Sequence, residues 1–180
     1  GGLGVASVGS STVFGAMSGV SLSSVAVVGR MAVPEMLERG YRPSFATGSV
    51  VASGALAMLI PPSLMFILYS SISGVGIGEL FAGGLVPGFL LATLMALYVM
   101  ITALVRPDIA PRTEAKVALG EKLAATKKVL PSLVLIVLVL GSIYTGIATA
   151  TEAAAVGVIG AIVVVGVFER QLSWANIKKI

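Results

Sequence analysis

The stretch FGAMSGVSLSSVAVVGRM, residues 14–31, decides how this chain folds, because it interrupts an apolar segment with a small polar run, SGVS, at residues 18–21. Two interpretations of residues 3–33 are open. The segment is either one tilted helix that crosses a membrane, or a re-entrant hairpin whose short arms, 3–17 and 22–33, meet at the polar run. Backbone that leaves the helix at membrane depth is tolerated only where protein buries it or where it lines a wet cavity. The run therefore marks either close packing or a binding site, and the sequence leaves both open.

The composition indicates an integral membrane protein. Of the 180 residues, 57% are hydrophobic and 11% are charged, and the mean hydropathy is +1.04. A soluble domain is less apolar and more highly charged. Apolar runs such as 85–105 and 129–144 suit helices, which satisfy their own backbone hydrogen bonds in lipid. The chain has no cysteine and no histidine, which excludes disulfides, thiolate metal sites and imidazole catalysis.

We therefore predict an all-α membrane protein in which four segments have roughly the length of a bilayer crossing. These are residues 44–73, 78–105, 129–150 and 151–168. With the connections included, the predicted organisation is a re-entrant hairpin (1–33), a cytoplasmic loop (34–43), a broken transmembrane helix (44–73), a transmembrane helix (74–105), a cytoplasmic loop with an interfacial amphipathic helix (106–128), and two transmembrane helices with a cytoplasmic tail (129–180).

The distribution of basic residues supports this topology. If the four segments alternate in direction, all twelve lysines and arginines fall on or near one side of the membrane, and the opposite turns carry none. The positive-inside rule makes that side cytoplasmic. The net charge of +4 then reflects topology and lipid headgroups. It does not indicate binding to nucleic acid, which requires a soluble basic surface with aromatic platforms.

A second interruption lies in SGALAMLIPPS, residues 53–63, where Pro61 and Pro62 follow an apolar run. Proline donates no backbone hydrogen bond, so carbonyls about one turn earlier, near Ala57 and Met58, lose their partners. Freed carbonyls and hydroxyls are ligands for a hard cation such as Na⁺, whereas the amide ends of half-helices attract an anion. A plain proline kink is the alternative. If both interruptions are functional, we expect them to converge on one site.

Glu79 and Glu152 are predicted to lie in the first turns of helices on the non-cytoplasmic side. An N-cap at Thr149 or Thr151 would make Glu152 a first-turn carboxylate, which is favourable to the helix dipole. A proton relay is the alternative for Glu152, because a carboxylate inside a membrane is usually functional.

Five motifs occur in a fixed order along the chain. They are FGAMSG (14–19), PEMLERGY (34–41), LIPPS (59–63), GELFAGGLVPGFLLA (78–92) and YTGIATATEAAAVG (144–157). Together they resemble the large membrane subunit of tripartite ATP-independent periplasmic (TRAP) transporters, the DctM-like family. The resemblance covers almost the whole chain, and we expect the chain to be a fragment of such a subunit.

The resemblance implies a Na⁺-coupled secondary transporter built from inverted repeats, with elevator-type alternating access. Such a transporter imports organic acids, such as C4-dicarboxylates, sialic acid or other carboxylates, which a periplasmic binding protein delivers, and it works with a small membrane (Q-type) subunit. The expected location is the bacterial inner membrane, as a multi-pass protein in the lipid bilayer. Na⁺ is the expected coupling ion, and no enzyme activity, organic cofactor or nucleic-acid partner is expected. Residues 129–180 would begin the second repeat.

The resemblance also implies which residues form the site, at the hairpin tip and at the broken helix. The implied Na⁺ ligands are Ser18, Gly19, Ser21, Ser53, Gly54 and Ala57. The implied substrate contacts are Ser18, Val20, Pro61, Pro62 and Ser63.

Two other functions are compatible with the residues. One is a Na⁺-coupled symporter for divalent anions that needs no binding protein. The other is a membrane scaffold without transport activity, in which the small residues only pack helices. An intramembrane serine protease is disfavoured, because no residue near Ser18 is a candidate general base.

Overall fold

The computed structural model describes residues 2–111, 119–164 and 166, and every regular element in these ranges is helical. This confirms the prediction of an all-α protein. The chain divides into two compact units, Gly1–Ala115 and Lys116–Ile180. Among the described helices, Ile77–Val105 is long and apolar enough to cross a membrane, with a mean hydropathy of 2.3 over an 18-residue window. The other apolar helices are shorter, so the four predicted crossings stay a prediction.

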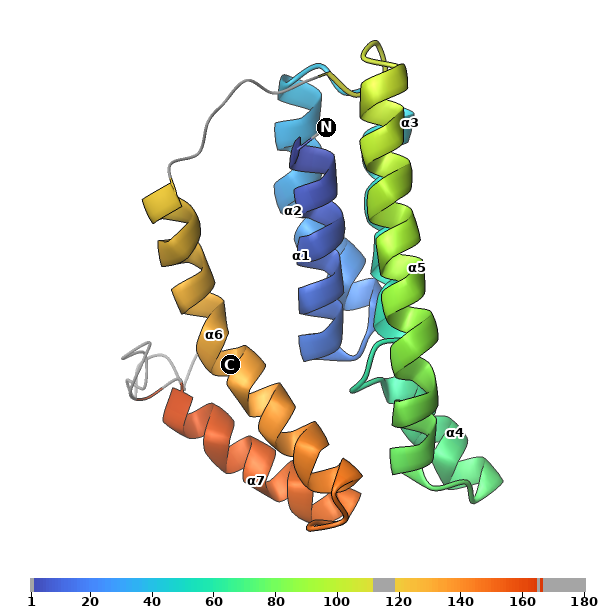
Figure 1. Cartoon of the computed structure of the whole chain (residues 1–180), viewed down its shortest axis with the longest axis vertical. Coiled ribbons are helices and arrows are strands. Elements are labelled where there is room, and N and C mark those ends of the chain that lie inside the picture. The colour runs from blue at the N-terminus through green and yellow to red at the C-terminus, as the bar shows by residue number, and fades with distance from the viewer. Residues whose placement is uncertain (1, 112–118, 165, 167–180) are drawn as a thin grey trace. The chain divides into compact units, whose positions relative to one another are not determined.

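In the first unit, residues 3–33 form two helices rather than one. Helix α1 (Gly2–Ser18) and helix α2 (Ser21–Glu38) lie side by side and are joined by Gly19 and Val20 (Figure 1). Gly19 has a φ of +64°, a left-handed conformation that glycine adopts without steric cost. The chain therefore reverses at the SGVS run, and the re-entrant placement of this hairpin in a membrane stays a prediction.

Helix α2 extends beyond its predicted arm to Glu38, so the loop predicted at 34–43 begins only at Arg39. Met36 is fully buried in the added turns, and the Arg39 guanidinium pairs with the Glu35 carboxylate one turn earlier. Burial and ion pairing keep these residues helical although a proline lies just before them.

The segment predicted as a broken helix is interrupted in its middle. Helix α3 (Pro43–Gly54) tightens into the 3₁₀ turn η1 (Ala55–Met58), and the chain becomes helical again as α4 (Leu64–Ser73). The break contains Pro61 and Pro62, which are joined by a cis peptide bond. Because neither proline has an N–H, the ladder of helical hydrogen bonds cannot continue across them.

Helix α5 (Ile77–Val105) packs against α1 and against the break between η1 and α4 (Figure 1). Two glycines make the second contact possible. A Cβ on Gly84 would lie 2.6 Å from the Leu59 carbonyl oxygen, and a Cβ on Gly88 would lie 2.8 Å from Ile60 Cγ1. Only residues without a side chain let the unwound backbone approach this closely.

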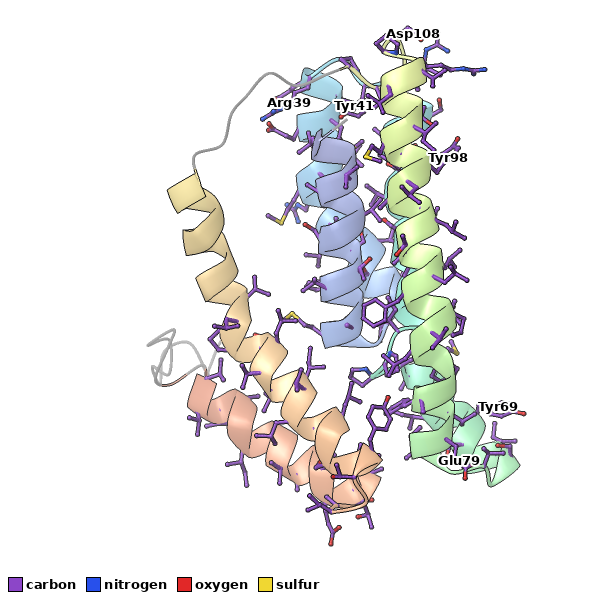
Figure 2. The ribbon with its side chains drawn as sticks, in the orientation of Figure 1. Arg39, Tyr41, Tyr69, Glu79, Tyr98 and Asp108 are labelled. Atoms are coloured by element: carbon purple, nitrogen blue, oxygen red, sulfur yellow. The ribbon has the colours of Figure 1, made fainter. Side chains whose placement is uncertain are left out.

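Charged residues gather at one end of the first unit. Arg42 pairs with Asp108 over 3.2 Å, and the Arg42 amide donates to the Ile109 carbonyl oxygen over 3.0 Å. Figure 2 shows Arg39 and Asp108 at this end, with Glu79 at the opposite end of α5. The positive-inside rule predicts that the arginine-bearing end is cytoplasmic.

A small apolar core lies at the same end. Its buried members are Met36, Tyr41, Ala46, Ala103 and Ala110, with Leu3, Val33 and Phe45 packed against them. Leu3 belongs to the first turn of α1 and Phe45 to the first turn of α3. Both helices therefore begin at this end and run in the same direction.

In the second unit, helix α6 (Leu119–Tyr144) packs against helix α7 (Ala150–Val163). A Cβ on Gly157 of α7 would lie 3.3 Å from Val139 of α6, so a glycine again permits close approach. Helix α6 begins inside the predicted interfacial segment and continues without interruption into the predicted span.

Part of the predicted organisation lies outside the described residues. This holds for residues 112–118, in the loop between the units, and for 165 and 167–180, which contain the end of the last predicted span and the predicted cytoplasmic tail.

A capping box closes the first turn of α7. The Thr149 hydroxyl accepts from the Glu152 amide over 3.3 Å, and the Glu152 carboxylate accepts from the Thr149 amide over 2.8 Å. Glu152 therefore lies in the first turn of a helix whose N-cap is Thr149, as the first interpretation of this residue predicted. Glu79 likewise lies in the first turn of α5.

Replacing Gly84 by alanine is expected to destabilise the protein, because the new Cβ would overlap the Phe66 ring and the Leu59 carbonyl oxygen. Overpacking of this kind costs about 1–3 kcal/mol. Gly83→Ala is the matched control, since a Cβ there meets no atom within 4 Å and both variants gain the same helix propensity. Thermal unfolding of the purified protein in detergent measures the difference, and equal melting temperatures would contradict this packing.

Candidate functional site

The two interruptions of the first unit lie against each other. The Leu64 amide, at the start of α4, donates to the Gly19 carbonyl oxygen at the hairpin tip over 3.1 Å. A Cβ on Gly19 would lie 2.8 Å from the Pro62 carbonyl oxygen, so the two backbones are in direct contact. The structure therefore brings the hairpin tip and the double-proline break together, as expected from the sequence if both form one site.

Close packing of α1 on α3 places the two interruptions at the same level. The buried residues of α1 are Gly4, Ser7, Val8, Ser11 and Gly15. Their counterparts 42 positions later are also buried, namely Ala46, Ser49, Val50, Ser53 and Ala57. A Cβ on Gly15 would lie 2.8 Å from the Ala57 Cβ, so the last pair is in contact. Two parallel helices in this register stop side by side.

At the hairpin tip, Ser18 and Ser21 differ in how their hydroxyls are used. The Ser18 hydroxyl accepts from the Val20 amide over 3.4 Å and donates to the Val20 carbonyl oxygen over 3.3 Å. The half-buried Ser21 hydroxyl has no hydrogen-bond partner within the described part of the chain. Val20 is partly exposed, whereas Gly19 is buried against the break. Ser21 therefore offers a free hydroxyl, and the Ser18 hydroxyl, although bonded within the turn, keeps one lone pair for a ligand.

At the end of α3, the three implied cation ligands are buried. The Ser53 hydroxyl donates to the Val50 carbonyl oxygen over 3.0 Å, and Gly54 packs against Val25 of α2. The Ala57 carbonyl would bond to residue 61 in a continuous helix, and with proline there it accepts no hydrogen bond from a described residue. Lone pairs on the Ser53 hydroxyl and the Ala57 carbonyl remain available to a ligand.

Within the break, Ser63 supplies the hydrogen bond that Pro62 cannot make. Its hydroxyl donates to the Met58 carbonyl oxygen over 2.7 Å, where the N–H of residue 62 would bond in a continuous helix. Ser63 and Pro61 are buried, and Pro62 is half-buried. The Ser63 hydroxyl proton is therefore engaged within the break.

Two helix N-termini begin at this place without a capping side chain. Helix α2 follows Val20, which has no side-chain oxygen, and helix α4 follows Ser63, whose hydroxyl makes no cap hydrogen bond. Amides in the first turn of a helix have no partner in the helix and carry a partial positive charge. The site thus combines free amides, which favour an anion, with a free carbonyl and hydroxyls, which favour a cation.

Acidic side chains do not form a metal site here. The described ranges contain no group of three or more acidic, histidine or cysteine side chains that could hold a metal ion. A cation at the two breaks would therefore be held by neutral oxygens.

The sequence analysis did not identify the three glycines that pack against the double-proline break and the turn before it. Gly15 carries the contact with Ala57, and Gly84 and Gly88 accommodate the break. Their signal is present in the sequence, because small residues four positions apart favour close helix packing. The sequence does not show which backbone each glycine meets.

A family model described as "Tripartite ATP-independent periplasmic transporter, DctM component" matches residues 1–180. Among curated relatives, the ectoine TRAP transporter large permease protein TeaC of Halomonas elongata is 41% identical over the whole chain. The C4-dicarboxylate TRAP transporter large permease protein DctM of Pseudomonas aeruginosa is 41% identical over 88% of the chain. The isethionate TRAP transporter permease protein DctMQ of Oleidesulfovibrio alaskensis is 35% identical over 96% of it. These matches span 42%, 36% and 27% of the three relatives, respectively.

Gly19→Ala is expected to destabilise the protein more than Gly74→Ala. The φ angles are +64° and +73°, so both variants place a side chain in the left-handed region, at a cost of about 1–2 kcal/mol. Only at Gly19 would the Cβ also meet a backbone oxygen, that of Pro62, because nothing lies within 4 Å of a Cβ on Gly74. Thermal unfolding of both variants measures the difference. Equal losses would show that the tip and the break are not in contact.

Proposed function

Since the chain belongs to the DctM component family of TRAP transporters, we propose that it forms part of a large permease subunit that imports organic acids together with Na⁺. The family is one of transporters, and its members are not enzymes, as expected from the sequence. The observation that carries the proposal is the direct contact between two interrupted helices, the hairpin tip at Gly19 and the break at Pro62.

The position of the contact along α5 supports a site within the membrane. Gly84 and Gly88 face the break, and they lie roughly 10 Å and 16 Å from the start of α5 at 1.5 Å per residue. The whole helix is about 43 Å long by the same measure, longer than the hydrocarbon core of a bilayer. If α5 crosses the membrane, both breaks lie at membrane depth. Unwound backbone at that depth is expected only where it serves a buried or wet site.

Neutral oxygens at the breaks suit Na⁺ as the coupling ion. The residues that would hold it are Ser18, Gly19 and Ser21 at the tip and Ser53, Gly54 and Ala57 at the end of α3. The free Ser21 hydroxyl and the free Ala57 carbonyl fit this role best, because neither has a partner within the described residues. When bound, Na⁺ supplies a positive charge beside the substrate.

The uncapped helix starts suit the carboxylate of an organic acid. First-turn amides of α2 and α4 would bind it, with Ser18, Val20, Pro61, Pro62 and Ser63 around it. Burying a carboxylate is costly unless a counter-charge is present. We propose that Na⁺ lowers this cost, so that each ligand raises the affinity for the other.

The complete transporter is proposed to be a multi-pass protein of the bacterial inner membrane. A periplasmic binding protein would deliver the substrate, a small membrane subunit would assemble with the permease, and alternating access would be of the elevator type. The names of the relatives mention ectoine, C4-dicarboxylate and isethionate.

Ser18→Ala and Ser21→Ala are each expected to raise the Na⁺ concentration needed for half-maximal uptake by about tenfold or more in the complete transporter. A hydrogen-bonding or ligating group to a charged partner is worth about 1.5–3 kcal/mol, and 1.4 kcal/mol is tenfold in affinity. Ser10→Ala, an exposed serine of α1, is the matched control and should leave uptake unchanged. An unaltered Na⁺ dependence in both tip variants would remove these residues from the site.

The complete permease is also expected to melt at a higher temperature in Na⁺ than in K⁺, by a few degrees, because a ligand that binds only the folded state stabilises it. Scanning fluorimetry in matched chloride salts measures this shift. A scaffold in which the small residues only pack helices predicts no difference between the salts. Na⁺-driven uptake that persists without the binding protein would favour a divalent-anion symporter instead.

A further inference from the structure

Three serines with no exposed surface lie on α1, α2 and α3, which pack on one another. They are Ser11, Ser24 and Ser53, each 0% exposed. The Ser24 hydroxyl donates to the Ser11 carbonyl oxygen over 3.0 Å, which joins α2 to α1. The residue after Ser24 joins α2 to α3, because a Cβ on Gly54 would lie 3.4 Å from the Val25 amide nitrogen.

The packing of α1 on α3 relates Ser11 to Ser53. Ser11 lies one turn before Gly15, and Ser53 lies one turn before Ala57, which Gly15 contacts. Because the two helices run in parallel and residues four apart share a face, Ser11 and Ser53 occupy the same level of the interface. The three serines therefore form one buried junction, which shares Ser53 with the residues proposed to hold Na⁺ and otherwise lies one turn further inside the hairpin.

One of the three serine hydroxyls at this junction has no hydrogen-bond partner among the described residues. Ser24 uses its proton on the Ser11 carbonyl, and Ser53 uses its proton on the Val50 carbonyl. Each of these hydroxyl oxygens keeps acceptor capacity. The Ser11 hydroxyl is buried and has no partner among the described residues. Burying a hydroxyl without a hydrogen-bond partner costs free energy, and a bound molecule that pairs with the Ser11 hydroxyl would remove that cost.

We propose that a single water molecule binds at this junction and links the three helices. It donates one hydrogen to Ser24 Oγ and one to Ser53 Oγ, and it accepts the hydrogen of Ser11 Oγ. Two acceptors and one donor are the complement of a water molecule, and about three hydrogen bonds are usual for a buried water. This water fixes the height of the hairpin on α3 and thereby the level at which the two breaks meet.

Thermal unfolding of the complete permease carrying Ser11→Ala tests the proposal, because the direction of the change in melting temperature differs between the two cases. The melts are run in choline chloride without Na⁺, so that the proposed transport site stays unloaded. A bridging water predicts a melting temperature lowered by roughly 2–4 °C, whereas Ser10→Ala on the exposed side of α1 leaves it unchanged. An unchanged or raised melting temperature for Ser11→Ala would overturn the proposal, because deleting an unpaired buried hydroxyl is neutral or stabilising.

A double-mutant cycle separates the water from simple packing. If Ser11 and Ser53 hold the same molecule, Ser11→Ala/Ser53→Ala should lower the melting temperature by much less than the sum of the single effects. Strictly additive losses would overturn the proposal. So would a Ser11→Ala effect that is seen only in Na⁺, since that result would assign a cation to the junction.

Density from a high-resolution structure of the complete permease gives a second measurement that needs no variant. The expected result is a peak within about 2.7–3.2 Å of all three hydroxyl oxygens. Well-defined density for the three side chains without such a peak would overturn the proposal. Neither result depends on transport, so the proposed function can fail while the water site stands.

Discussion

The close parallel packing of α1 on α3 is the contact on which the rest of the first unit depends. Both helices bury small residues in the same register, and Gly15 of α1 packs directly against Ala57, which follows α3. In a membrane, such approach is what drives helices together, since lipid tails are as apolar as the side chains. Because both helices start at the same apolar core, the 17 residues of α1 and the 12 and 4 residues of α3 and η1 bring their ends to a similar level. The two interruptions meet there.

Part of the polar backbone that the interruptions release is bonded again nearby, which helps to stabilise them. The Gly19 carbonyl receives the Leu64 amide, and the Met58 carbonyl receives the Ser63 hydroxyl. Glycines on α1 and α5 give the unwound backbone the space it needs. The groups left over include the Ala57 carbonyl, whose charge suits a cation, and the remaining first-turn amides of α2 and α4, whose charge suits an anion.

Backbone groups dominate this site, and that agrees with the variety among its relatives. The names of related permeases mention ectoine, C4-dicarboxylate and isethionate. An amide or carbonyl of the main chain is present whatever the side chain, so changes of side chain would leave these groups of the proposed site in place. In the second unit, the capping box at Thr149 and Glu152 shows the opposite solution, a helix start closed by its own side chains.

The sequence by itself determined the helical class, the positions of both interruptions and the helix start at Glu152, because these follow from hydropathy, proline, glycine and capping chemistry within a few residues. Its ordered motifs also indicated the family. Only the tertiary structure decided that residues 3–33 fold back on themselves, that α2 continues past its proline, and that the tip meets the break. It also decided which polar atoms are free: Ser63 proved to be bonded to Met58, whereas Ser11 is buried without a partner. These features depend on contacts between residues some 40 positions apart, and local sequence patterns do not encode which distant backbone a glycine or a serine will meet.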